Sequence, residues 1–305
     1  MITSFLSIIP LFLVIFTGFL LSRFRFVDSS LIKANNKLVF YIFLPALLID
    51  KIASSSIKDM FDVKILIVLY GSVLLIFIVS ILVSLSLKID KKDVGTVAIG
   101  SFRGNFAYMG LPVAYYLFAD EGIVISSMLI AFIVPFVNIL SIFSLSLSSK
   151  GDYKKAIINS FLTPIVVASL LGIILSIYSV KIPNILEKFL NLLSAPALTL
   201  ALLGIGASLQ FKEIAKKPYL MILSSFFKLV MLPFFGIIFL HFIHINSVYA
   251  SVVLIMLASP AATLNYIMAQ QMDGDEILAS ATICFSTVFS FITYGFWIYY
   301  LKHCF

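Results

Sequence analysis

Two apolar stretches of the sequence are interrupted next to polar side chains, residues 100–112 by glycines and a proline and residues 258–266 by a proline. Glycine and proline disturb the backbone hydrogen bonds of a helix, and freed N–H and C=O groups are tolerated inside a membrane only where they line a polar cavity or lie buried in protein. The N-terminal end of each half-helix carries partial positive charge, which suits an anion. These stretches therefore indicate reversible binding of an anion at two facing helix breaks.

The candidate binding residues lie at these breaks. Asn105 and Asn265 each offer a neutral amide that can both donate and accept hydrogen bonds, which suits a carboxylate. We expect Gly104, Pro112 and Pro260 to shape the same site through the backbone. The alternative is that the two asparagines only satisfy the broken backbone or join neighbouring helices.

Two basic residues lie inside apolar segments. Arg103 is about 14 Å from the expected start of its segment at Val94, hence near the middle of the bilayer. Burying an arginine there costs at least ~2.5 kcal/mol, which favours a functional role. The competing interpretations are bonds to backbone carbonyls at the break or a side chain that reaches the membrane surface. Lys228 is a weaker candidate, for which pairing or snorkelling is favoured.

Asn138 and Gln270 are the candidates for ion coupling or support. Asn138 lies about one turn after Pro135 and is favoured as a helix-packing residue, whereas Gln270 ends its segment and is favoured as interfacial. No Asp or Glu lies in the middle of an expected helix, so the acidic pair typical of a cation or proton antiporter is missing. H⁺, Na⁺ and the membrane potential are all left open as the driving force.

The sequence predicts neither an enzyme nor a cofactor or metal site. It has no His-Glu-x-x-His zinc motif, no nucleophile elbow and no phosphate-binding loop. The two cysteines, Cys284 and Cys304, have no metal-ligand spacing.

Composition places these residues in a membrane. Of the 305 residues 62% are hydrophobic and 11% are charged, against roughly a quarter charged in soluble domains. The net charge of +7 comes from lysines in short loops, so it indicates membrane topology and not nucleic-acid binding. Apolar runs of about 20 residues predict ten transmembrane helices, near 4–22, 30–50, 64–87, 94–118, 122–148, 156–178, 184–209, 219–242, 247–271 and 276–301.

Positive charges predict the orientation of these helices. The loops after odd-numbered helices carry twelve Lys and Arg residues, and the opposite side carries five. By the positive-inside rule the odd loops face the cytoplasm and both termini face outward. We therefore expect a multi-pass protein of the cell (inner) membrane.

The chain resembles itself at an offset of about 150 residues. Ile9-Pro10 aligns with Thr163-Pro164 at an offset of 154, and Pro45-Ala46-Leu47 aligns with Pro196-Ala197-Leu198 at 151. Residues 1–148 and 156–305 then form two five-helix repeats, joined by a short linker at 149–155. Because five is odd, the second repeat enters the membrane from the opposite face, and such inverted repeats indicate alternating access.

The motifs resemble a known family. Residues 103–113 (RGNFAYMGLPV) and 259–271 (SPAATLNYIMAQQ) are similar to the auxin efflux carrier family, whose bacterial members are usually described as malate or malonate permeases. The resemblance implies a bile-acid-transporter-like fold in which broken helices 4 and 9 cross. It also implies a scaffold of helices 1, 2, 6 and 7 that often dimerises, and a mobile core of helices 3–5 and 8–10.

These observations together predict an all-α integral membrane protein that carries a small organic anion, such as a mono- or dicarboxylate, by elevator-like alternating access. The expected partners are the anion, H⁺ or Na⁺ as a coupling ion, membrane lipid and a second copy of the chain, without nucleic acid. The alternatives are a channel-like uniporter and a non-transporting sensor of the same fold. An exchanger of inorganic cations is disfavoured because buried carboxylates are missing.

Overall fold

The computed structural model describes residues 5–55, 62–147, 162–214, 216–243 and 245–304. The described residues form helices joined by turns, and the β-type contact among them is one bridge between Gly104 and Ala261. In chain order the helices are α2 (Ile9–Arg23), α3 (Ser29–Leu38), α4 (Leu44–Ala53), α6 (Lys64–Ser86), α7 (Lys91–Phe102), α8 (Leu111–Ser146), α10 (Pro164–Ile177), α11 (Asn184–Ser194), α12 (Ala197–Ala207), α13 (Pro218–Phe226), α14 (Leu232–Phe242), α15 (Ser247–Leu257), α16 (Leu264–Gln271) and α17 (Glu276–Cys304).

Six helical stretches of the described chain are long and apolar enough to cross a membrane. They are Ser29–Ala53, Lys64–Ser86, Phe106–Ser146, Asn184–Ala207, Pro218–Phe242 and Glu276–His303. The expectation of an all-helical membrane protein is confirmed for the part of the chain that the structure describes. The expected linker at 149–155, and residues 156–161 of the sixth expected segment, lie outside the described residues.

Three helices contain a π-helical turn directly before a Leu-Pro pair. These turns are η1 (Val39–Phe43), η2 (Phe106–Gly110) and η4 (Phe227–Met231), followed by Pro45, Pro112 and Pro233. Proline lacks the N–H that bonds four residues back, and its ring collides with that carbonyl. A wider i→i+5 turn accommodates both problems, so the helix continues through the proline.

Two of the expected helices are broken at their centres. The fourth expected segment consists of α7, a break at residues 103–105, η2 and the first arm of α8. The two arms of α8 meet at Ala119, whose φ of 48° and ψ of −134° are not helical. The ninth expected segment consists of α15, a break at 258–263, and α16. Both breaks coincide with the glycine- and proline-containing stretches.

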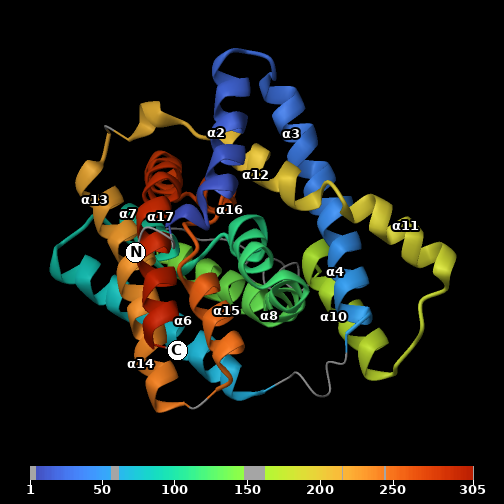
Figure 1. Cartoon of the computed structure of the whole chain (residues 1–305). Helices are drawn as coiled ribbons and strands as arrows, with labels where there is room; N and C mark the ends of the chain where they lie inside the picture. Colours follow the sequence, from blue (N-terminus) through green and yellow to red (C-terminus); the bar gives the residue numbers. More distant parts are fainter. Residues whose placement is uncertain (1–4, 56–61, 148–161, 215, 244, 305) are drawn as a thin grey trace.

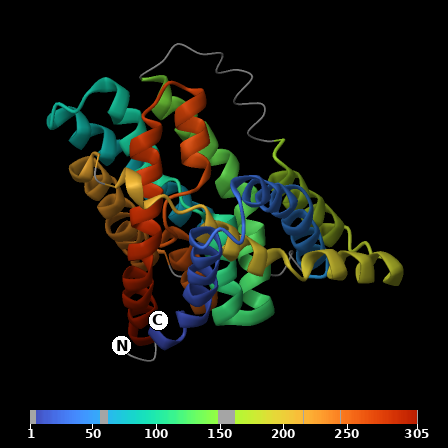
Figure 2. The same ribbon diagram turned by 90° about the horizontal axis from the view of Figure 1, so that it is seen from above.

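The helices form two groups on either side of α8. Figure 1 shows α3, α4, α10 and α11 on one side of α8 and α7, α13, α14 and α17 on the other, and the rotated view in Figure 2 keeps this separation. Helix α2 packs against α12, and α4 packs against α10. Glycine permits the first of these contacts, because a Cβ at Gly18 would collide with the backbone of Leu203 and one at Gly206 with the backbone of Ile15.

Candidate functional site

The two helix breaks pair with each other. Gly104 and Ala261 form an antiparallel bridge, flanked by the Asn105 N–H donating to the Pro260 carbonyl at 2.7 Å and the Ala262 N–H donating to the Arg103 carbonyl at 3.0 Å. We call residues 103–105 and 258–263 the crossover. Each break thus satisfies backbone groups of the other, as burial requires. Glycine relieves crowding at position 104, since a Cβ there would collide with the Ser259 Oγ and lie 2.7 Å from the Phe106 ring.

Arg103 lies in the crossover and bonds two asparagines. It is 5% exposed, and its guanidinium donates to the Asn138 Oδ1 at 2.6 Å and to the Asn265 Oδ1 at 3.3 Å. The Asn265 Nδ2 in turn donates to the Ile99 carbonyl in the last turn of α7, at 3.3 Å. The structure therefore places Arg103, Asn138 and Asn265 together. The Arg103 side chain is buried, and its hydrogen bonds within the described part of the chain go to the two asparagines and not to a backbone carbonyl.

Lys228 lies beside the same crossover. Its side chain is fully buried in η4, and the ammonium donates to the Leu257 carbonyl at the end of α15, at 2.7 Å. A cation is favourable there because a helix C-terminus carries partial negative charge. The C-terminal ends of α7 and α15 are thus each satisfied by a side chain, from Asn265 and Lys228 respectively.

Asn105 differs from Asn265 in that its amide nitrogen has no partner. The residue is 4% exposed and the Asn105 Nδ2 makes no hydrogen bond within the described structure. Pro112 lies in the first turn of α8, directly after η2. Gln270 lies apart from these groups, exposed near the end of α16, where it donates to Glu276 at 3.0 Å.

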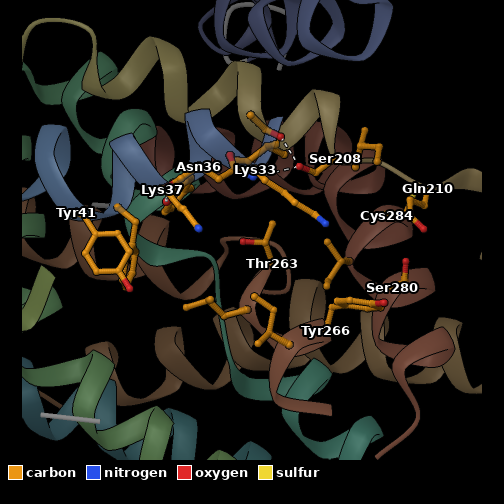
Figure 3. Close-up of a pocket in the computed structure, with 18 residues that line it drawn as sticks. Lys33, Asn36, Lys37, Tyr41, Ser208, Gln210, Thr263, Tyr266, Ser280 and Cys284 are labelled. Atoms are coloured by element: carbon orange, nitrogen blue, oxygen red, sulfur yellow. Dashed lines mark hydrogen bonds between the residues drawn. The ribbon is translucent and has the colours of Figure 1, made fainter. Parts of the chain in front are cut away.

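A cavity of about 530 Å³ opens beside the crossover, between α3 and α12 on one side and η2, α16 and α17 on the other. This volume suits a small metabolite. Figure 3 shows the ammonium groups of Lys33 and Lys37 directed toward the space on either side of Thr263. Thr263 precedes the first residue of α16, and no side chain caps that helix N-terminus. Tyr108 also lines the cavity and donates from its hydroxyl to the Asn36 carbonyl at 3.2 Å.

The sequence analysis did not predict these lining residues of the cavity. It counted Lys33 only as a loop charge and assigned no role to Asn36, Lys37, Tyr108 or Thr263. One signal was available, because Lys33, Asn36 and Lys37 have i, i+3, i+4 spacing and so share one face of a helix. This spacing does not predict that the shared face lies beside the crossover, because that depends on tertiary packing.

No carboxylate of the described residues lines this cavity or pairs with Arg103 or Lys228. A site between broken helices in an all-helical membrane protein is typical of membrane transport proteins. The sequence comparisons agree with this class. The chain belongs to the family described as membrane transport protein, whose sequence profile matches residues 3–157 and 152–298.

Two curated archaeal relatives span nearly the whole chain. An uncharacterized transporter, MJ1031, of Methanocaldococcus jannaschii is 26% identical over 300 residues, covering 93% of this chain and 94% of the relative. An uncharacterized transporter of Methanothermobacter thermautotrophicus is 20% identical over 294 residues, covering 95% and 96%. The family consists of transporters, and the chain is accordingly not an enzyme.

Proposed function

We propose that the protein is a secondary carrier of a small organic anion, such as a mono- or dicarboxylate like malate or malonate. The observation that carries this proposal is the cavity in which Lys33 and Lys37 flank the uncapped N-terminus of α16. Two ammonium groups and a helix N-terminus all favour negative charge. Polar side chains are present on several sides of the cavity, but most of the lining surface is apolar, which suits a small anion with a short carbon chain.

The charge balance of the crossover supports an anion over a cation. Arg103 and Lys228 are buried among neutral groups, and the described lining of the cavity adds two lysines without a carboxylate. In a medium of low dielectric constant each such cation repels a second cation and attracts an anion strongly. In this proposal the Asn105 Nδ2, which has no partner among the described residues, is a further donor in the crossover, although Asn105 does not itself line the cavity.

We propose elevator-like alternating access for the transport cycle. In this proposal the chain has ten transmembrane helices in two inverted repeats, residues 1–148 and 156–305, in a bile-acid-transporter-like arrangement. The packing of α2 on α12 and of α4 on α10 supports it, since each pair joins elements of the two halves. A dimer, a place in the cell membrane with both termini outside, and coupling to H⁺ or Na⁺ belong to the same proposal.

Uptake of radiolabelled malate and malonate into proteoliposomes tests the proposal. We expect saturable uptake that is slow enough to give no unitary currents in planar bilayers, which separates a carrier from a channel. Unitary currents would contradict a carrier, and a failure of every mono- and dicarboxylate to move under any ion gradient or membrane potential would overturn the proposed function.

A further inference from the structure

Away from the cavity, three charged residues meet at one end of the core. The Lys217 ammonium contacts the Asp93 carboxylate at 2.7 and 2.8 Å and the Asp275 Oδ2 at 2.6 Å. Asp93 lies in the first turn of α7, Lys217 directly precedes α13, and Asp275 directly precedes α17. The two aspartates are only 4% and 9% exposed. We call these three residues the Asp93 cluster.

The two aspartates have different surroundings. The Asp275 carboxylate accepts from the Leu278 N–H at 2.8 Å and so caps the first turn of α17. The backbone N–H of Asp275 donates to the Thr96 Oγ1 at 2.9 Å. Capping a helix N-terminus favours an ionised carboxylate. The Asp93 carboxylate accepts from Lys217 and, among the described residues, from no backbone N–H.

The cluster therefore has two carboxylates for one ammonium. Burial, together with the neighbouring Asp275, raises the pKa of Asp93 against the opposing effect of Lys217. Burial also acts to raise the pKa of Asp275, but the bonds from Lys217 and the Leu278 N–H outweigh it and lower that pKa. Bonds to both carboxylates raise the pKa of Lys217 despite its partial burial. One proton on Asp93 would neutralise the cluster.

We propose that Asp93, held against Asp275 and Lys217, is a binding site for one exchangeable proton that clamps together the ends of α7, α13 and α17. When the proton leaves, a second negative charge appears beside Asp275 in a buried setting, and the two carboxylates repel each other. The contact between α7 and the start of α17 then weakens. Helix α7 runs directly from Asp93 to the crossover, so the proton acts on a helix that positions Arg103.

Among the described residues, further charged side chains adjoin the cluster along the chain, including the exposed Asp90 at the start of α7. Lys91 and Lys92 lie beside Asp93, Lys216 beside Lys217, and Asp273 and Glu276 beside Asp275. Lys91, Lys92, Lys216 and Asp273 are exposed, and Glu276 accepts from Gln270. Solvent screens exposed charges, so the close pair of carboxylates dominates the titration of Asp93.

Thermal unfolding of the purified protein at pH values from about 4 to about 8, followed by the fluorescence of Trp297, tests the site. The pKa of Asp93 is raised in the folded state, so protonation of Asp93 stabilises the fold. This stabilisation is complete below the pKa that Asp93 has in the unfolded chain, and it is lost as pH rises through the pKa of the folded state. We expect the wild-type midpoint temperature to fall over this range. Asp93→Asn, which keeps a neutral side chain in place, should remove most of that fall.

Two further variants make the test specific. Lys217→Met should move the fall to higher pH, because carboxylates without their cation hold the proton more tightly. Asp273→Asn is the matched control, since Asp273 is exposed and has a φ of 54°, which asparagine tolerates, and it should behave as wild type. If the midpoint temperature of Asp93→Asn falls with pH as much as that of the wild type, the proton site is overturned. If Asp93→Asn does not fold, the same conclusion follows when the fall in Lys217→Met occurs at the wild-type pH.

The consequence for transport rests on the proposed carrier function. Uptake by wild-type proteoliposomes should change with the pH on the side of the Asp93 cluster, and uptake by Asp93→Asn should not. An identical pH profile in the two proteins would overturn the coupling of this proton to transport. Absence of all uptake would count against the carrier function, while the unfolding measurements would still decide the proton site.

Discussion

At the scale of single residues, Asn105 in the crossover and Asn265, in the first turn of α16 directly after it, have different hydrogen bonds. Both amide atoms of Asn265 are used, one accepting from Arg103 and the other donating to Ile99. The Asn105 Nδ2 is buried without a partner in the described structure. An unsatisfied buried donor costs about 1–3 kcal/mol, and a bound anion would recover that free energy.

Alanine substitutions should therefore affect the two positions differently. Asn105→Ala should leave the thermal midpoint nearly unchanged and lower uptake at least tenfold, because it removes a donor that no protein group uses. Asn265→Ala should destabilise the protein by about 1–3 kcal/mol, because it removes one of the two side-chain partners of the buried Arg103 guanidinium and the side-chain donor to the Ile99 carbonyl. Thermal unfolding and uptake measured on the same preparations check both. Equal destabilisation by the two substitutions would contradict the assignment.

Lys33 and Lys37 contribute to the cavity as single charges. Replacing either by methionine should raise the KM for the anion roughly ten- to a hundredfold, because a hydrogen bond to a charged group contributes about 1.5–3 kcal/mol. Lys188→Met is the control, since Lys188 is exposed on α11 and does not line the cavity. Concentration-dependent uptake gives the KM values. The cavity is not the binding site if all three variants retain the wild-type KM.

At the scale of helices, the sequence predicted where they would break but not which side chains would meet. Glycine, proline and apolar length determine breaks and spans locally, and the two breaks lie where they were expected. Arg103 contacts Asn138, which lies on α8 and 35 residues further along the chain. This contact depends on how α8 packs, and no local sequence pattern predicts that packing. Proline also predicts an interruption, whereas the π-helical turns carry the helix through Pro45 and Pro233.

The crossover itself gives a prediction at this scale. Gly104→Ala should lower stability by about 1–3 kcal/mol and remove uptake, because the new Cβ would push Ser259 and Phe106 and separate the two paired helix breaks. Gly71→Ala is a matched control. Its Cβ would meet only the end of the Phe239 ring, at 3.0–3.4 Å, which can shift. Thermal midpoints and uptake rates of the two variants distinguish an effect specific to the crossover from the general cost of adding a methyl group. Equal losses of stability and uptake in the two variants would contradict the specific role of Gly104.

For the whole molecule, the question is whether the helices around α3 and α12 move against the helices around η2 and α16. The cavity lies between α3 and α12 on one side and η2 and α16 on the other, and the Tyr108 hydroxyl crosses it to the Asn36 carbonyl. The group around α3 and α12 is held together by the Asn35 Nδ2, which donates to the Leu200 carbonyl at 3.1 Å. Elevator-like motion would break the first contact in each cycle and keep the second.

Cross-linking at these two contacts tests the motion. In a protein whose Cys284 and Cys304 are replaced by serine, Asn36→Cys with Tyr108→Cys joined by a short bis-methanethiosulfonate linker should reduce uptake to the background of empty liposomes. Reduction of the two linker disulfides should restore it. Asn35→Cys with Leu200→Cys, joined in the same way, should retain uptake, because both positions lie in one group. Full uptake after complete cross-linking of positions 36 and 108 would mean that the contact across the cavity never opens, and the substrate would then have to pass between fixed helices as in a channel.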